Sequence, residues 1–275
     1  MRDGKSGMMG ARGTMPGRDA TSRPNQRLNI PAQDRILPAG TAQREVRMPA
    51  LTFERRSGGT RDTVTFAPTD LVVAGWTGTD EKGLQHHIDE LAALGVPPPS
   101  SVPVFYRNAV SNVIQVDRLQ VLGPDTSGEA EPVVLAMADG LWLTVGSDHT
   151  DRKAEAMGIA LSKQLCGKVV GKTAWRLADV ADRWDSLIIR SHATIDGRRV
   201  LYQEGTLKSL RHPADLIARY ATGKSLAVGT VMMGGTMSAI GGIRPATRFE
   251  MELEDPATGE RLSHAYDIEV LPVVS

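Results

Sequence analysis

GEAEPVVLAMADGLWLTVGSD, residues 128–148, consists of two apolar runs that meet at Asp139-Gly140. An Asp-Gly pair between apolar runs is a strong signal for a β-hairpin, so this stretch predicts two antiparallel strands around a two-residue turn. In that register Glu131 faces Asp148. Because side chains alternate between the two faces of a strand, Glu129 lies on the same face as Glu131. The hairpin is therefore expected to bring three carboxylates together at its open end.

Three carboxylates at one strand end repel one another unless water or a cation separates them. Mg²⁺ prefers oxygen ligands, and three carboxylates suit it. The hairpin therefore predicts a metal site made by Glu129, Glu131 and Asp148. The alternative is that the strand ends are simply hydrated.

A second group of acids, Glu250-x-Glu252-x-Glu254, has a similar spacing. There Phe249, Met251 and Leu253 alternate with the glutamates and supply an apolar face. The strand is therefore predicted to bury its apolar residues and to present the glutamates to solvent.

Upstream of the hairpin, residues 80–95 carry apolar side chains at helical spacing and are predicted to form a helix. Residues three positions apart lie on one side of a helix, so His87 and Glu90 can form a hydrogen-bonded pair. A carboxylate partner fixes the imidazole tautomer and raises its basicity, as a general base requires. The alternative is an ordinary pair on the helix surface.

The rest of the ordered chain is mostly alternating strands with a few helices. We expect strands at 51–55, 63–66, 226–230, 249–254 and 266–271, a hairpin turn at Asp196-Gly197, and helices at 153–165, 176–184 and 213–220. No internal repeat or second linker is evident. The pattern predicts one mostly β domain with a few helices, an α+β protein.

The N-terminal residues 1–47 differ in composition from the rest. They hold nine Lys and Arg against four Asp and Glu, a charge of +5, so residues 48–275 carry −5 within a chain of zero net charge. Six Gly, four Pro and no aromatic residue cannot bury enough apolar surface to offset the entropy of ordering. We therefore expect a disordered basic tail over 1–47 and a folded domain over 48–275, with Met48 as a candidate natural start.

Composition also excludes several classes of protein. Zero net charge argues against a dedicated nucleic-acid binder, and no apolar run reaches the roughly 18 residues of a membrane span. The single cysteine, Cys166, excludes an internal disulfide framework and a cysteine zinc site, and we expect a buried thiol. The N-terminus lacks the apolar core of a signal peptide. These features indicate a cytoplasmic protein.

Two further motifs are weaker. Ser147, Asp148 and His149 resemble a catalytic triad by composition, but adjacent strand residues point to opposite faces and cannot meet as one. The glycine-rich segment 229–236 lacks the Gly-Lys-Ser/Thr ending of a phosphate loop. It is expected to be a tight loop whose amides can approach a ligand.

The order of these motifs resembles the fumarylacetoacetate hydrolase-like superfamily from about His86 to Val270. The resembling segments are His87-x-x-Glu90, Pro103-Val104-Phe105-Tyr106-Arg107, Glu129-Ala130-Glu131, Ser147 to Arg152, Gln203-Glu204-Gly205-Thr206, and Leu226 to Thr230 with its Gly-Thr ending. Within this group the chain looks closest to a branch described only as a domain of unknown function.

The resemblance implies a fold and a metal. The fold is a mixed β-sandwich or β-roll with a single catalytic domain, and family members usually form homodimers. Mg²⁺ or Mn²⁺ is bound by the residues that correspond here to Glu129, Glu131 and Asp148. His149 and Asp151 replace less polar residues of the family, and either could add to the coordination.

The resemblance also implies an activity on a small-molecule substrate. The metal would chelate a 1,3-dicarbonyl or acylpyruvate-type acid and stabilise an enolate, and His87 with Glu90 would activate water. Lys163 would stabilise the developing negative charge. Substrate oxygens would be contacted by three residues, Arg107, Gln203 and Thr230.

The expected function is therefore a metal-dependent hydrolase that cleaves a carbon–carbon bond. Two alternatives stay open. One is an oxo-acid decarboxylase, isomerase or hydratase on the same metal site, and the other is an inactive protein that binds a small molecule.

Overall fold

The computed structural model describes residues 50–82, 84–85 and 98–274, all within one compact unit, Val46–Ser275. The predicted tail, 1–47, lies outside the described residues. So do His87 and Glu90 and most of the predicted helix 80–95, of which Glu81, Lys82, Leu84 and Gln85 are described and helical.

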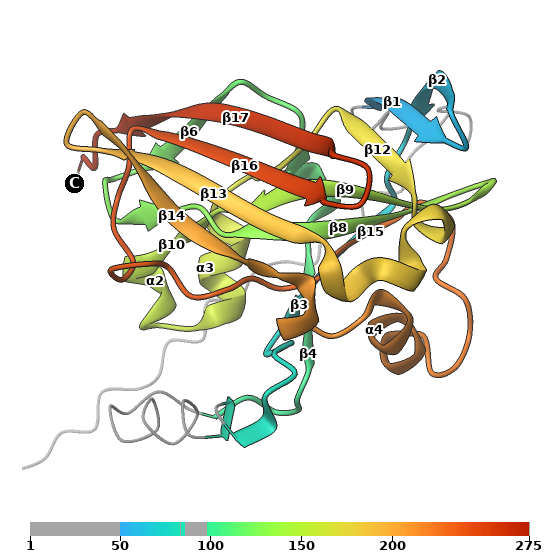
Figure 1. Cartoon of the computed structure of the whole chain (residues 1–275). Helices are drawn as coiled ribbons and strands as arrows, with labels where there is room; N and C mark the ends of the chain where they lie inside the picture. Colours follow the sequence, from blue (N-terminus) through green and yellow to red (C-terminus); the bar gives the residue numbers. More distant parts are fainter. Residues whose placement is uncertain (1–49, 83, 86–97, 275) are drawn as a thin grey trace, which may run out of the picture. The chain divides into compact units, whose positions relative to one another are not determined.

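The larger of the sheets has ten strands, and its main path runs β2-β1-β12-β9-β8-β15-β3-β4 (Figure 1). Its strands are β1 Leu51–Ser57, β2 Thr60–Phe66, β3 Asp70–Gly75, β4 Val104–Asn108, β5 Val113–Ile114, β8 Ala130–Met137, β9 Gly140–Asp148, β11 Lys168–Val170, β12 Thr173–Arg176 and β15 Thr230–Met233. Strand β11 pairs with β9 and β5, off the main path.

A five-stranded sheet, ordered β14-β13-β16-β17-β6, packs across one face of the larger sheet. Its strands are β6 Arg118–Leu122, β13 Ile188–Ile195, β14 Arg198–Thr206, β16 Arg248–Asp255 and β17 Glu260–Leu271. The short strands β7 Thr126–Ser127 and β10 Thr150–Asp151 pair with each other beside the end of β9.

The helices are short and connect the sheets. They are α2 Arg152–Glu155, α3 Ile159–Leu165 and α4 Pro213–Tyr220, with 3₁₀ turns η1 Val110–Asn112, η2 Leu177–Asp179, η3 Ala181–Ser186 and η4 Leu207–Ser209. None of the helices that the structure describes could cross a bilayer, because each is too short or too polar. The prediction of a mostly β protein with a few helices is confirmed.

The central strands of the larger sheet, such as β8 and β15, are buried on both faces. Toward the five-stranded sheet the larger sheet contributes Val134, Leu143 and Val145 to one core cluster, and its other face forms a second cluster that includes Val133 and Leu135. Strand β8 is therefore buried at every position, a pattern typical of a central strand.

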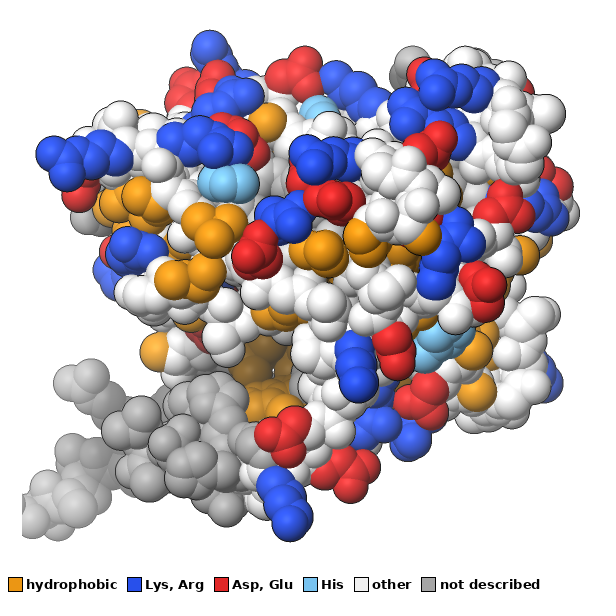
Figure 2. All heavy atoms as spheres, in the orientation of Figure 1, with side chains coloured by type: hydrophobic (Ala, Val, Ile, Leu, Met, Phe, Trp, Pro, Cys, Tyr) orange, Lys and Arg blue, Asp and Glu red, His pale blue; other side chains and the backbone are white. Residues whose placement is uncertain are grey.

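The strand β16 has the predicted alternation. Phe249, Met251 and Leu253 are buried, and the glutamates between them are half-buried on the outer face. Figure 2 shows Lys and Arg interspersed with Asp and Glu over the surface where Figure 1 draws β16 and β17.

The predicted register of the first hairpin is wrong by two residues. Met137 pairs with Gly140, so the turn is Ala138-Asp139, and Glu131 faces Gly146 instead of Asp148. The second hairpin has its turn at Asp196-Gly197, as predicted. There both turn residues have positive φ, 50° and 75°, as a two-residue hairpin turn of this kind requires. At the first hairpin Asp139 is not in that conformation, and Gly140 belongs to the strand.

Three other element boundaries differ from prediction. The helix expected at 153–165 is two helices, because the backbone of Gly158, with φ +158°, is not helical and interrupts it. The helix expected at 176–184 is a pair of 3₁₀ turns, and the strand expected at 226–230 begins at Thr230 and runs to Met233. The helix predicted at 213–220 is confirmed; it begins with Pro213 at its first turn.

Candidate metal centre

Three carboxylates meet at one end of the β8–β9 hairpin. One oxygen each of Glu129, Glu131 and Asp148 lies within 4.8 Å of the others. Glu129 stands just before β8 and is partly buried, whereas Glu131 and Asp148 are 2% and 0% exposed. The predicted convergence is therefore present, although Asp148 is opposite Glu129, whose carbonyl accepts the Asp148 N–H at 3.0 Å.

The backbone of the next strand closes one side of the cluster. Gly235 follows β15, and its N–H donates to Glu131 Oε2 at 2.9 Å. A Cβ at Gly235 would lie 1.9 Å from Thr77 Oγ1, and φ there is +91°, so glycine is required for this approach. The tight loop predicted at 229–236 is wrong over Thr230–Met233, which form strand β15, and the Gly235 amide after this strand bonds a carboxylate of the protein itself.

Three cationic side chains from three different elements surround the carboxylates. Arg152 of α2 places Nη2 2.8 Å from Glu129 Oε1, and Lys163 of α3 places Nζ 3.3 Å from Glu129 Oε2. Lys163 also bonds Asp148 Oδ2 directly. The fully buried Lys168 of β11 places Nζ 2.7 Å from Asp148 Oδ1. Three cationic side chains thus lie beside the carboxylate cluster, and these contacts are to Glu129 and Asp148.

The pKa values of the buried groups reflect these contacts. Burial raises the pKa of Glu131 well above its usual range, and repulsion from Asp148 raises it further. Burial acts in the same direction on Asp148, but Lys163 and Lys168 outweigh it and lower the pKa of that carboxyl. The carboxylates Asp148 and Glu129 likewise outweigh burial at Lys163 and raise its pKa. Glu131 is the member whose charge the protein stabilises least.

His149 does not join the carboxylates. Its ring nitrogens lie 2.9 Å from the Tyr266 hydroxyl and 2.9 Å from Thr126 Oγ1, and burial lowers its pKa to about 3, so the ring is neutral. The Tyr266 hydroxyl donates to Ser147 Oγ at 2.8 Å. Asp151 accepts the Ala154 N–H and caps α2. Both residues therefore have structural partners outside the candidate ligand set.

The substrate contacts expected from the resemblance lie in different places. Gln203 is near the cluster, but its amide is used within the protein: Oε1 accepts the Ala130 N–H at 3.0 Å, and Nε2 donates to Thr236 Oγ1 at 2.8 Å. It connects the peptide between Glu129 and Glu131 to the segment after β15.

Thr230 and Arg107 are not brought to the carboxylates. Thr230 begins β15, and the neighbouring Gly229 N–H bonds the Ala136 carbonyl, five residues along β8 from Glu131. The Gly-Thr pair beside the cluster is instead Gly235-Thr236. Arg107 bonds Asp70 and the Tyr220 hydroxyl on the face of β4 opposite to Tyr106.

Sequence reasoning missed Tyr106, Arg152 and Lys168. Tyr106 shares the core face of Val133, and its pKa is raised, by burial in the first place, and is also affected by the charges of Lys163 and Asp148. Arg152 and Tyr106 lie in segments that carried the family resemblance. No spacing in the sequence indicated that Lys168 lies beside Asp148. The pairing of β11 with β9 places the two residues opposite each other.

The donor set suits a hard divalent cation. Carboxylate oxygens are the preferred ligands of Mg²⁺ and related ions, and the separations among these three allow one ion to contact all of them. A cation would also stabilise the charge of Glu131, whose pKa is raised by burial and, to a smaller extent, by repulsion from Asp148. These residues therefore fit a metal.

A model of the family described as a protein of unknown function, DUF2848, matches residues 74–266. The match spans most of the chain, including both strands of the carboxylate hairpin. This chain belongs to that family. No curated protein matches it.

Solved structures show the fold. A 2-keto-3-deoxy-D-arabinonate dehydratase complexed with magnesium and 2,5-dioxopentanoate has a TM-score of 0.54 at 14% identity, over 77% of this chain and 78% of that one. A fumarylacetoacetate hydrolase family protein from Yersinia pestis CO92 has a TM-score of 0.51 at 14% identity, over 80% and 100%. Cg1458 has a TM-score of 0.52 at 18% identity, over 77% and 80%. The DUF2848 protein thus has a fumarylacetoacetate hydrolase-like fold, similar to that of these three structures.

Proposed function

We propose that this DUF2848 protein is an enzyme that binds Mg²⁺ or Mn²⁺ through Glu129, Glu131 and Asp148 and hydrolyses a carbon–carbon bond in a 1,3-dicarbonyl or acylpyruvate-type acid. The observation that carries the proposal is the meeting of these three carboxylates in a buried site. The dehydratase with the similar fold holds magnesium and a dioxo acid, which supports the choice of metal and substrate class.

The cation supplies a Lewis acid that can hold substrate oxygens and stabilise the negative charge of an enolate. The protein side chains orient the carboxylates and add positive charge beside them. Arg152 pairs with Oε1 of Glu129 and Lys168 with Oδ1 of Asp148, which fixes the orientation of both carboxylates. Lys163 keeps its proton because its pKa is raised, so it is available to stabilise negative charge beside the cluster.

Tyr106 is a further candidate for contact with substrate. Burial raises the pKa of its phenol, so the hydroxyl stays protonated at neutral pH and can donate a hydrogen bond. Figure 2 shows a hollow with apolar side chains inside it, at the place where Figure 1 draws β3 and β4. Tyr106 belongs to β4. Access for a small acid is therefore expected from this side.

Activation of water is assigned to His87 with Glu90 on the strength of their spacing in the sequence and the family resemblance. The other expected substrate contacts, Arg107, Gln203 and Thr230, have weaker support, because the first and last lie away from the carboxylates and the amide of Gln203 is already bonded. We also expect a cytoplasmic protein that forms a homodimer. Light scattering on the purified protein tests the homodimer.

A second candidate reaction is dehydration or decarboxylation of a 2-oxo acid. Both reactions can pass through an enolate and need the same metal site, and the dehydratase with the similar fold is the observation in their favour. They differ from hydrolysis in needing no activated water. Substitution of His87 can therefore distinguish the two candidate reactions.

The decisive experiment assays acylpyruvates, oxaloacetate and a 2-keto-3-deoxy sugar acid with Mg²⁺ or Mn²⁺, with and without a chelator. We expect cleavage of an acylpyruvate that is lost on chelation and in Glu131→Gln, and retained in the control Glu252→Gln. Turnover that survives complete removal of metal contradicts the proposal. Loss of hydrolysis in His87→Ala supports water activation, whereas conversion of a 2-oxo acid that persists in this variant favours the second candidate.

A further inference from the structure

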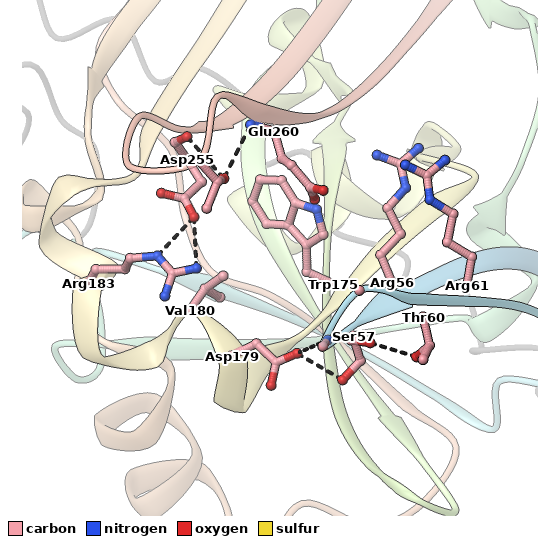
Figure 3. Close-up of a pocket in the computed structure, with 13 residues that line it drawn as sticks. Arg56, Ser57, Thr60, Arg61, Trp175, Asp179, Val180, Arg183, Asp255 and Glu260 are labelled. Carbon is pink, nitrogen blue, oxygen red and sulfur yellow. Dashed lines mark hydrogen bonds and ion pairs between the residues drawn. The ribbon is translucent and has the colours of Figure 1, made fainter.

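A separate cavity of about 190 Å³ opens where the β1–β2 turn, η2–η3 and the β16–β17 turn meet (Figure 3). Its floor is a row of side chains on three neighbouring strands. Arg61 of β2 pairs with Arg56 of β1, and Arg56 pairs with Trp175 of β12. Paired residues on neighbouring strands point to the same face, so two guanidinium groups and an indole lie side by side.

This cavity is distant from the carboxylates. Trp175 pairs with Leu143 of β9, and Asp148 lies five residues further along that strand. At about 3.4 Å per residue the separation is about 17 Å. A ligand here would therefore not contact the candidate metal ligands.

The two arginines leave a positive charge on the floor. Like charges directly opposite each other on paired strands repel. Among the described residues, Arg56 and Arg61 share one ion-pair partner, Glu54, whose Oε1 lies 2.8 Å from Arg56 Nε and 3.9 Å from Arg61 Nη1. A single carboxylate cannot neutralise both groups.

The indole of Trp175 supplies an independent sign of a ligand. The side chain is 4% exposed, and its Nε1–H has no hydrogen-bond partner in the part of the chain that the structure describes. Figure 3 shows the indole among the lining residues, with its nitrogen on the side where Arg56 lies. A buried donor without a partner costs free energy, so an acceptor placed in the cavity would be favoured.

Two of the three acids that line the cavity, Asp179 and Asp255, are already bonded. Asp179 Oδ2 accepts Ser57 Oγ–H at 2.8 Å and the Gly58 N–H at 3.2 Å, which fixes the β1–β2 turn. Asp255 Oδ2 lies 2.8 Å from both Nε and Nη2 of Arg183. Neither acid is directed at the pair of arginines on the floor.

We propose that this cavity binds a small molecule through one oxyanion head, a carboxylate or a phosphate, held by Arg56 and Arg61 and hydrogen-bonded by the indole N–H of Trp175. Glu260 lines the same cavity and repels a second anionic group. The rest of the ligand is therefore neutral, and a hydroxyl next to the head suits the carboxylate of Glu260.

The test follows the indole N–H resonances of the full chain by ¹H–¹⁵N NMR during titration with phosphate or with glycolate, at constant ionic strength and with a chelator present. Trp175→Phe identifies the Trp175 resonance. We expect this resonance to shift saturably with at least one of the two probes. A shift with phosphate alone identifies a phosphate head, and a shift with glycolate alone identifies a carboxylate head.

Three variants complete the test. Arg61→Ala should weaken binding about tenfold, as expected for loss of a charge-assisted hydrogen bond, and its 64% exposed side chain allows substitution without disturbing the fold. Glu260→Gln should tighten binding severalfold. The control Arg118→Ala removes an equally exposed arginine from β6 and should change nothing. The proposal is overturned if Trp175 does not respond to either probe, if the Trp76 resonance near Tyr106 moves instead, or if Arg61→Ala binds as the wild type does.

Discussion

The two acidic triplets of this protein have similar sequence patterns and opposite surroundings. Glu129, Glu131 and Asp148 meet in the interior, where Glu131 and Asp148 have almost no exposed surface. The outer glutamates of β16, Glu250, Glu252 and Glu254, have side chains 28%, 26% and 15% exposed. Both groups are bonded by cations, so pairing with Lys or Arg does not distinguish them.

The charge of the glutamates is stabilised in opposite ways at the two places. On the outer face, hydrogen bonds from Arg199 and Arg190 lower the pKa values of Glu250 and Glu254. In the interior, burial raises the pKa of Glu131. The outer glutamates gain little from a further cation, whereas Glu131 remains a charge that a metal would stabilise. A Glu-x-Glu spacing therefore does not define a metal centre; burial and convergence with a third carboxylate from another strand do.

The largest expected difference between the two triplets is in metal affinity. Glu131→Gln should lower the affinity for Mn²⁺ about a hundredfold or more, because it removes one of three charged ligands. Glu252→Gln should leave the affinity unchanged. Isothermal titration of the two purified variants measures both values. Equal affinities in these variants would remove the distinction between the triplets.

The next effect concerns the cations. Lys163→Met leaves buried carboxylates with one cation fewer, so the free energy of unfolding in a chelator should fall by about 3 kcal/mol. Added Mn²⁺ should restore much of the loss, because it replaces the missing positive charge.

Arg261→Met is the matched control on the outer face. Its side chain is 55% exposed and pairs with Glu252 and Glu254, so the expected change is below about 0.5 kcal/mol. Urea unfolding with and without Mn²⁺ measures both variants. A Lys163→Met protein as stable without metal as the wild type would show that the interior charges need no compensation.

The smallest effect is a pH dependence on the outer face. The hydrogen bond from Arg199 lowers the pKa of Glu250 below its usual 4.5, so the pair contributes stability above that pH and loses it as the pH falls through the folded-state pKa. Glu250→Gln should be less stable than the wild type by about 0.5 kcal/mol at neutral pH, and the difference should vanish in acid. Arg199→Gln should give the same pH profile. If the difference in stability between Glu250→Gln and the wild type increases as the pH falls, this explanation is wrong.

The periodicity of the strands made the convergence of carboxylates predictable even though the register was wrong. The turn is displaced by one residue, which shifts the pairing by two positions. Side chains repeat every two residues, so a shift of two leaves Glu129, Glu131 and Asp148 on the same face. A shift of one would have separated Asp148 from the glutamates.

The neighbours of the carboxylates could not be predicted in the same way. Lys168 reaches Asp148 because β11 pairs with β9, and Gly235 reaches Glu131 because β15 pairs with β8. The family resemblance implied that Thr230 contacts substrate at the end of its strand, whereas the observed strand begins at Thr230. Pairings between distant strands depend on the packing of the whole sheet and leave no local periodicity.

By itself, the sequence determined the mostly β class, the alternation that buries one side of β16, and the set of three carboxylates, because each follows from a period of two along a strand. The tertiary structure alone decided that Glu131 and Asp148 are buried where the three carboxylates meet. It also decided which cations surround the buried triplet, and that Arg56, Arg61 and Trp175 line a separate cavity. Those properties depend on which distant strands become neighbours, since burial and local charge are set by the surroundings of a residue and not by its own position in a pattern.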